Sequence, residues 1–123
     1  LARALVRAPA ILPIAVGVAE PAAVADLIAA LLPHALVIVS TDLSHYHDYK
    51  TAQRLDRATS QAIEQLRLED IQYDHACGRN PVSGLLQVAR QRGLKAKTID
   101  LRNSGDTAGS HDQVVGYGAY VFE

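Results

Sequence analysis

The stretch IVSTDLSHYH at residues 38–47 decides which fold and which chemistry the sequence predicts. It closes an apolar run, 35–39, of a kind that is typical of a strand buried on both faces of a parallel sheet. In such sheets the reactive groups lie just past the carboxyl ends of the strands, and here Asp42, His45 and His47 follow at that point. The alternative is a polar turn in which Asp42 caps a helix and both histidines are exposed.

The flanking segments complete an α/β pattern. A strand over 11–18, a helix over 21–32 and a strand over 35–40 predict a right-handed βαβ unit. Further along the chain we expect helices over 49–66 and 81–92, strands over 95–101 and 113–122, and a short helix over 1–10. The predicted fold is a single α/β domain over 1–123, with a mostly parallel or mixed sheet of about four strands and helices on both faces.

Local signals support several of these boundaries. Asp48 is a candidate N-cap for the helix over 49–66, and Gly93 is typical of the residue that follows a helix. Gly116 and Gly118 in the last strand indicate the close approach of another backbone or a ligand. The apolar stripe that we expect on the helix over 49–66 consists of Leu55, Ala58, Ala62, Ile63 and Leu66.

Composition excludes several classes of function. The 123 residues carry a net charge of −1, so the chain has no basic footprint for nucleic acid and no polybasic surface for a membrane. No apolar run approaches the ~20 residues that a transmembrane helix needs. The single cysteine excludes an internal disulfide and fits a reducing, cytoplasmic compartment. Methionine is absent, so we expect the chain to be part of a longer protein.

Cys77 is a second place that could carry chemistry. It lies about one turn before Pro81, where the positive end of a helix dipole would act on the sulfur, and Arg79 adds positive charge nearby. Both influences favour the thiolate, which is the form that attacks or binds metal. The alternative is a buried, inert cysteine.

The loop 102–112 is the third such place. Its polar candidates are Asn103, Ser104, Asp106 and His111. These residue types and their neighbouring glycines are the usual formers of turns, so the sequence favours a plain turn over a binding role.

In series, four motifs resemble those of one known family. They are STDLSHY at 40–46, ACGRNPVSGLL at 76–86, NSGD at 103–106 and VVGYGAYVF at 114–122. Their order and rough spacing are similar to those of the Memo-like family, also called AmmeMemoRadiSam system protein B. That family resembles class III extradiol ring-cleavage dioxygenases, which have an α/β core and a non-haem metal pocket. The resemblance implies that this chain is the C-terminal portion of such a protein.

The resemblance also implies roles for single residues. His45 matches a histidine that acts as acid/base beside the metal, and Asp42 lines the same pocket. Cys77 stands where the dioxygenases have a carboxylate ligand, so the implied metal ligands here are Cys77 and His45. Two further histidine ligands belong to the family's N-terminal half, and nothing in residues 1–39 matches them. Possible pocket-lining residues are His47, Arg79, Asn103, Ser104 and Asp106.

The leading hypothesis is therefore a metal-dependent, dioxygenase-like oxidoreductase of unknown substrate, with non-haem iron or copper. A thiolate in place of a carboxylate keeps the charge but softens the site, which favours copper or a changed iron potential. On this hypothesis the chain alone lacks ligands. We expect it to bind metal weakly or not at all, to be inactive and to self-associate where the missing N-terminal half would pack.

The alternative is a non-catalytic, signalling-adaptor-like module that binds a peptide or protein in the same pocket. Family members are also described as adaptors for phosphorylated peptides. Phosphate recognition usually requires a cluster of arginines, and only Arg79 and Arg102 lie near the candidate loops. The expected partners are thus a small molecule or a peptide, the missing half of the protein, and a second copy of the chain; nucleic acid and membranes are not expected.

Overall fold

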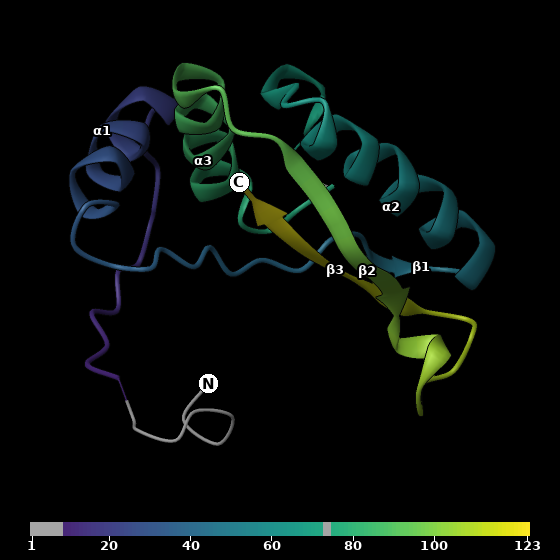
Figure 1. Cartoon of the computed structure of the whole chain (residues 1–123). Helices are drawn as coiled ribbons and strands as arrows, with labels where there is room; N and C mark the ends of the chain where they lie inside the picture. Colours follow the sequence, from purple (N-terminus) through teal and green to yellow (C-terminus); the bar gives the residue numbers. More distant parts are fainter. Residues whose placement is uncertain (1–8, 73–74) are drawn as a thin grey trace.

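The computed structural model describes residues 9–72 and 75–123 and shows an α/β fold (Figure 1). In chain order the elements are α1 (Pro21–Leu31), β1 (His45–His47), α2 (Tyr49–Glu64), the 3₁₀ turn η1 (Leu68–Asp70), α3 (Arg79–Arg92), β2 (Ala96–Asn103), the 3₁₀ turn η2 (Ser104–Asp106) and β3 (Val114–Phe122). The three strands form one antiparallel sheet in the order β1-β3-β2.

Several local predictions are confirmed. The Asp48 carboxylate accepts hydrogen bonds from the backbone N–H groups of Lys50 and Thr51, and so caps α2 as expected. Gly93 ends α3 in the left-handed conformation, with φ of 67°. α2 ends at Glu64, two residues before the predicted end, and α3 begins at Arg79, two residues before Pro81.

The helices α2 and α3 pack on the same side of the β2–β3 ribbon. Ala62 and Ile63 of α2 share a core cluster with Val82 and Leu86 of α3, and strand residues pack against that cluster. The strand residues in question are Ala96, Tyr120 and Phe122. The prediction of helices on both faces is wrong within the described residues, because β2 and β3 turn alternate residues such as Ile99 and Val121 to solvent on the other face.

A second core cluster joins α1 to α3. It contains Val24, Ala25 and Ile28 of α1 and Val88 of α3. The two helices lie side by side in Figure 1, and α3 thus links the α1 layer to the sheet. The side-chain amide of Asn80 also donates to the carbonyl of Gly17, at 2.9 Å, and ties the segment before α1 to the start of α3.

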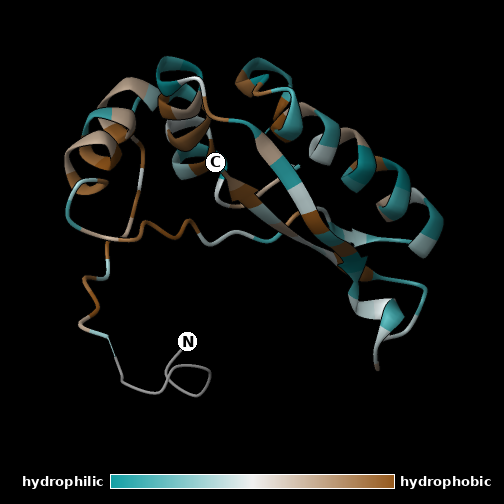
Figure 2. Ribbon diagram, viewed as in Figure 1, coloured by the Kyte–Doolittle hydropathy of each residue, from teal (hydrophilic) through white to brown (hydrophobic). Residues whose placement is uncertain are grey.

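The predicted parallel βαβ unit is not formed. Segments 11–18 and 35–40 run as extended chain on either side of α1, but neither is a strand of the described sheet (Figure 1). Val37 and Val39 pack against the α1–α3 cluster, whereas Leu36 and Ile38 are 86% and 57% exposed. A strand needs a neighbour to receive its backbone hydrogen bonds. These two segments are as hydrophobic as buried strands, but no neighbouring strand pairs with them. Figure 2 shows how apolar the extended chain is.

Two smaller predictions also change. The stretch after 35–40, expected as a loop, contains the short strand β1. The apolar stripe of α2 is displaced, because Ala58 is exposed while Asp56, Thr59 and Ser60 are buried. The short helix predicted over 1–10 lies almost wholly outside the described residues.

Candidate metal centre

Asp42, His45 and Cys77 come together at one place. Each offers one potential ligand atom, and the three atoms all lie within 4.8 Å of one another. His45 Nε2 is 3.6 Å from Asp42 Oδ2. Asp42 lies between the extended segment 35–40 and β1, His45 opens β1, and Cys77 lies just before α3. Two loops that are distant in sequence therefore supply a carboxylate, an imidazole and a thiol to one cluster.

The sheet fixes the first of these loops. Leu43 N–H donates to the carbonyl of Gly116 at 2.9 Å, and Gly116 N–H donates to the carbonyl of Ser44 at 2.8 Å. Leu43 itself is only 1% exposed. The backbone between Asp42 and His45 is thus paired with β3 and anchored by the buried Leu43. The side chains of Asp42 and His45 therefore extend from a rigid backbone.

Asp56 of α2 supports the same loop and was missed by the sequence reasoning. Its carboxylate is 2% exposed and accepts the N–H of Ser44 at 3.0 Å. A Cβ atom on Gly116 would lie 2.1 Å from Asp56 Oδ2, so the glycine makes room for this carboxylate. Asp56 shares one helix face with Ala52 and Ile63, but the burial of that face is seen only in the structure, so the sequence alone gave no signal for this carboxylate.

The close approach predicted at Gly116 and Gly118 is thus made by the protein's own side chains. Gly116 faces Asp56, and a Cβ on Gly118 would lie 2.4 Å from the hydroxyl of Tyr120. Tyr120 packs against the α2–α3 core cluster, and its burial raises the pKa of the phenol. Neither glycine marks a ligand site by itself.

Cys77 is held against the loop of Asp42. The backbone N–H of Asp42 donates to the sulfur, with a distance of 3.3 Å between nitrogen and Sγ. The thiol is nevertheless exposed, so it is not the buried, inert cysteine that the sequence left open as an alternative.

The remaining predicted residues are not among the possible metal ligands. Tyr46 has φ of 61°, and the β1–β3 register shifts between His45 and His47. His47 therefore does not continue the line of His45, and it is outside the group of possible metal ligands. The Nε–H of Arg79 donates to the carbonyl of Ile71, so this arginine supports the chain before α3.

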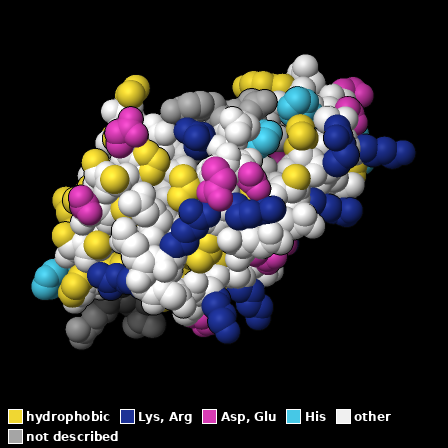
Figure 3. All heavy atoms as spheres, turned by 90° about the horizontal axis from the view of Figure 1, so that it is seen from above, with side chains coloured by type: hydrophobic (Ala, Val, Ile, Leu, Met, Phe, Trp, Pro, Cys, Tyr) yellow, Lys and Arg dark blue, Asp and Glu magenta, His cyan; other side chains and the backbone are white. Residues whose placement is uncertain are grey.

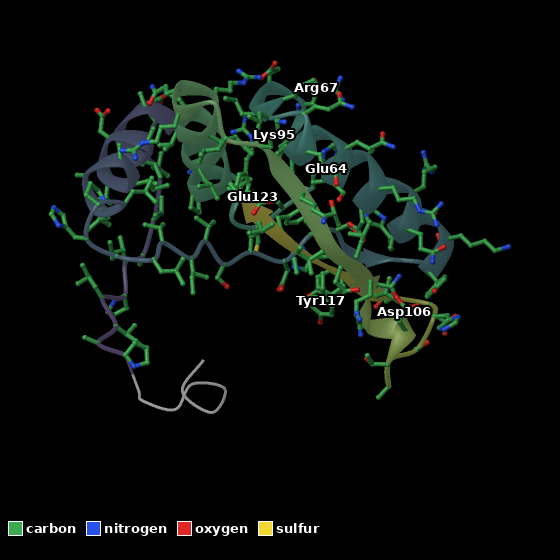
Figure 4. All side chains as sticks on the ribbon, in the orientation of Figure 1. Glu64, Arg67, Lys95, Asp106, Tyr117 and Glu123 are labelled. Atoms are coloured by element: carbon green, nitrogen blue, oxygen red, sulfur yellow. The ribbon has the colours of Figure 1, made fainter. Side chains whose placement is uncertain are left out.

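The loop that contains Asn103, Ser104 and Asp106 forms a capped turn, as the sequence favoured. Asn103 Oδ1 accepts the N–H of Gly105 at 2.9 Å, and Asp106 Oδ2 accepts the N–H of Asn103 at 2.8 Å. Ser104 Oγ accepts the N–H of Val115. Figure 4 shows Asp106 at the η2 end of the sheet, far from Glu123 at the opposite end. The polar side chains of this loop serve the turn itself.

Tyr49 docks the same turn onto the start of α2. Its hydroxyl donates to Asp106 Oδ1, and His111 stacks on its ring with 4.4 Å between ring centroids. The hydrogen bond from Tyr49, and then that from the N–H of Asn103, lowers the pKa of the Asp106 carboxyl. The same bond raises the pKa of Tyr49. The turn therefore holds the start of α2 close to the start of β3.

Thiolate, imidazole and carboxylate are together a donor set for a transition metal. Sulfur and nitrogen ligands suit copper, zinc and iron, and catalytic sites usually keep three protein ligands and an open position. Bonds from a metal to such ligands are about 2.0–2.3 Å long. The ligand atoms of Asp42, His45 and Cys77 lie within 4.8 Å of one another, so the donor types and their spacing fit a metal ion.

The fold and this cluster define an α/β protein with a Cys–His–Asp centre at a sheet edge. The chain belongs to the Memo-like protein family, whose model matches residues 1–121. It is 35% identical over 109 residues to a MEMO1 family protein of Methanosarcina mazei, covering 80% of this chain and 40% of that protein. A MEMO1 family protein of Aquifex aeolicus is 35% identical over 95 residues, covering 72% of this chain and 36% of that protein. The chain thus spans about two-fifths or less of the length of these relatives.

The charged side chains on the face drawn in Figure 3 are of both signs. In Figure 3 the Lys and Arg side chains on the visible face are interspersed with Asp and Glu. Arg102, one of the two arginines near the candidate loops, is paired with Asp100 at 2.6 Å, which raises the pKa of its guanidinium. Among the described residues, none of the helices is both long enough and apolar enough to cross a membrane.

Proposed function

We propose that Asp42, His45 and Cys77 form one side of a metal centre in a dioxygenase-like oxidoreductase, with iron or copper as the metal. The observation that carries the proposal is the convergence of three different ligand types from two loops on a rigid support. Family membership agrees with it, because the residues lie in motifs that resemble the family's metal pocket. A reducing cytoplasm would keep the exposed thiol available.

Each residue has a separate role in this proposal. Cys77 supplies the soft, negatively charged ligand. His45 Nε2 lies 3.6 Å from Asp42 Oδ2, so the carboxylate lies beside the imidazole and helps to orient it. His45 thereby holds or moves a proton beside the metal, or binds it as a second ligand. A bound iron or copper would supply the one-electron chemistry and the open positions for oxygen and substrate.

An apolar groove leads to the cluster of Asp42, His45 and Cys77. The two extended segments that do not pair with the sheet form much of its lining. Its volume is about 940 Å³, and it is lined by 9–16, 34–40 and one face of α1. Cys77, Gly78 and Pro81 lie at its border. We propose that this groove receives a further part of a full-length family protein, which brings the remaining ligands. The support is that the relatives are more than twice as long as the part that this chain matches.

Metal titration of the chain and of matched variants tests the proposal. Titration calorimetry with Fe(II) under argon should give weak one-to-one binding, because the ligand set is partial. Cys77→Ser should weaken it at least about tenfold, since it removes the only thiolate. His34→Asn is the control: His34 is exposed and outside the cluster, so its loss should change nothing. Equal titrations of the parent chain and Cys77→Ser, whether both bind or neither binds, would contradict the proposal.

The same groove favours a second candidate function, a non-catalytic module that binds an apolar peptide or protein segment. Exposed Leu36 and Ile38 support it, and the structural bonds of Arg79 and Arg102 count against phosphorylated peptides. The metal content of a full-length family protein separates the two functions. Stoichiometric metal that Cys77→Ser removes supports the oxidoreductase. Absence of metal, with partner binding unchanged by Cys77→Ser, supports the module.

A further inference from the structure

We infer that Thr41 is a positioning residue for the proposed centre, and that its hydroxyl locks the loop of Asp42 to the loop of Cys77. The inference rests on the proposed function and adds a residue that is not one of the proposed metal ligands. Thr41 is half-buried and lies directly before Asp42. It is the place where the two ligand-bearing loops touch.

Three contacts converge on the Thr41 hydroxyl. The N–H of Gly78 donates to Oγ1 at 2.7 Å, and Oγ1 is 3.5 Å from Cys77 Sγ. Oγ1 also donates to the carbonyl of Asp42 at 2.7 Å. One side chain thus contacts the backbone on both sides of the cluster and the sulfur itself.

The contacts on the hydroxyl depend on the direction of its single proton. A hydroxyl has one proton and two lone pairs, and the Gly78 N–H occupies one lone pair. The proton can point to the carbonyl of Asp42 or to Cys77 Sγ, because both lie within reach. A sulfur bound to a metal only accepts hydrogen bonds, so its donors would be the Asp42 N–H and the Thr41 O–H. Hydrogen bonds to a ligand sulfur reduce its electron donation and so tune the metal.

The packing around Gly78 provides independent support for the lock. A Cβ atom on Gly78 would lie 2.6 Å from Thr41 Cβ and 3.1 Å from the carbonyl oxygen of Ser40. The φ of Gly78 is −93°, which any residue adopts, so the backbone conformation does not require glycine. The glycine is required because the two loops approach closely enough for the Gly78 N–H to reach the hydroxyl.

Two substitutions separate the hydroxyl from the shape of Thr41. Thr41→Val keeps the volume and removes the hydrogen bonds, whereas Thr41→Ser keeps the hydroxyl and removes one methyl group. Ser40→Ala removes an exposed hydroxyl from the neighbouring residue and is the matched control. The probe is Co(II) added in excess to the whole chain, read from the sulfur-to-cobalt charge-transfer absorption and its dependence on concentration.

The expected result is specific to the hydroxyl. Thr41→Val should weaken Co(II) binding about tenfold or more and move the sulfur-to-cobalt band to longer wavelength, because the sulfur loses a donor. Thr41→Ser should retain the parent band, and Ser40→Ala should behave like the parent chain. Amide exchange gives a reading without metal: the Gly78 N–H should exchange faster in Thr41→Val and not in Thr41→Ser.

Other outcomes overturn the inference in distinguishable ways. A parent-like band and affinity in Thr41→Val would leave the metal centre standing and remove Thr41 from it. Equal losses in Thr41→Val and Thr41→Ser would show that keeping the hydroxyl does not keep the centre, and would refute a role that is specific to the hydroxyl. A parent chain without any sulfur-to-cobalt band would overturn the proposed function together with the inference.

Discussion

The two sides of this molecule differ in how completely their strands are paired and their apolar side chains are buried. On the sheet side, the strands β1, β2 and β3 pair their backbones, Leu43 is buried, and the Asp56 carboxylate of α2 accepts the N–H of Ser44. On the α1 side, segments 11–18 and 35–40 are extended and leave large apolar side chains exposed around the groove. Cys77 lies where the two sides meet. The sheet side therefore supplies a rigid support for the proposed centre, whereas the apolar groove that leads to the centre is open to solvent.

The largest contrast should come from two leucines, one on each side. Leu43→Ala should destabilise the chain by about 2–5 kcal/mol, because Leu43 is 1% exposed and its removal leaves a cavity. Leu36→Ala should change stability by no more than about 0.5 kcal/mol, since Leu36 is 86% exposed. Urea unfolding followed by circular dichroism measures both. Similar losses for the two variants would mean that the α1 side is as tightly packed as the sheet side.

A pair of glycines tests the same difference with smaller side chains. In Gly116→Ala the new methyl group would overlap the Asp56 carboxylate, which is buried and cannot move away. We expect a loss of about 1–3 kcal/mol. In Gly17→Ala nothing lies within 4 Å of the added Cβ, so stability should hardly change. The same unfolding assay reads both, and a neutral Gly116→Ala would refute the tight fit around Asp56.

Self-association should depend on the groove and not on exposed apolar residues in general. Ile38→Lys places a charge in the groove lining and should lower the fraction of dimers and larger species several-fold in light scattering. Val18→Lys is the control, because Val18 is fully exposed but is not part of the lining. If both variants lower association equally, the groove has no special role.

The smallest expected effect is a pH dependence at the turn that Tyr49 clamps. The pKa of Asp106 is lowered in the folded chain, so its contribution is present above its ordinary pKa of 3.8 and is lost as pH falls through the folded value. Tyr49→Phe removes the hydrogen bond that is the largest single cause of this lowered pKa. The difference in unfolding midpoint between parent and Tyr49→Phe should therefore shrink as pH falls below about 4. A difference that is constant with pH would show that the bond does not depend on the Asp106 charge.

Much of the local structure was predictable because short-range physics determines it. The Asp48 cap, the left-handed Gly93 and the capped turn at Asn103 depend on residues within a few positions of one another. The residues of the candidate cluster were also named from the sequence, since Asp42 and His45 lie in one motif and Cys77 lies in another. Their contact within 4.8 Å is a property of the fold.

The sequence by itself determined which segments are helical, which are apolar and extended, and which residues can bind a metal. Only the tertiary structure decided how these segments pair. The run 35–40 has the composition of a doubly buried strand, but a strand forms only where another strand pairs with its backbone, and none of the described strands pairs with this run. The burial of Asp56 likewise depends on Ser44 and Gly116, which are distant in sequence. Pairing and burial are contacts between distant residues, and local composition cannot specify them.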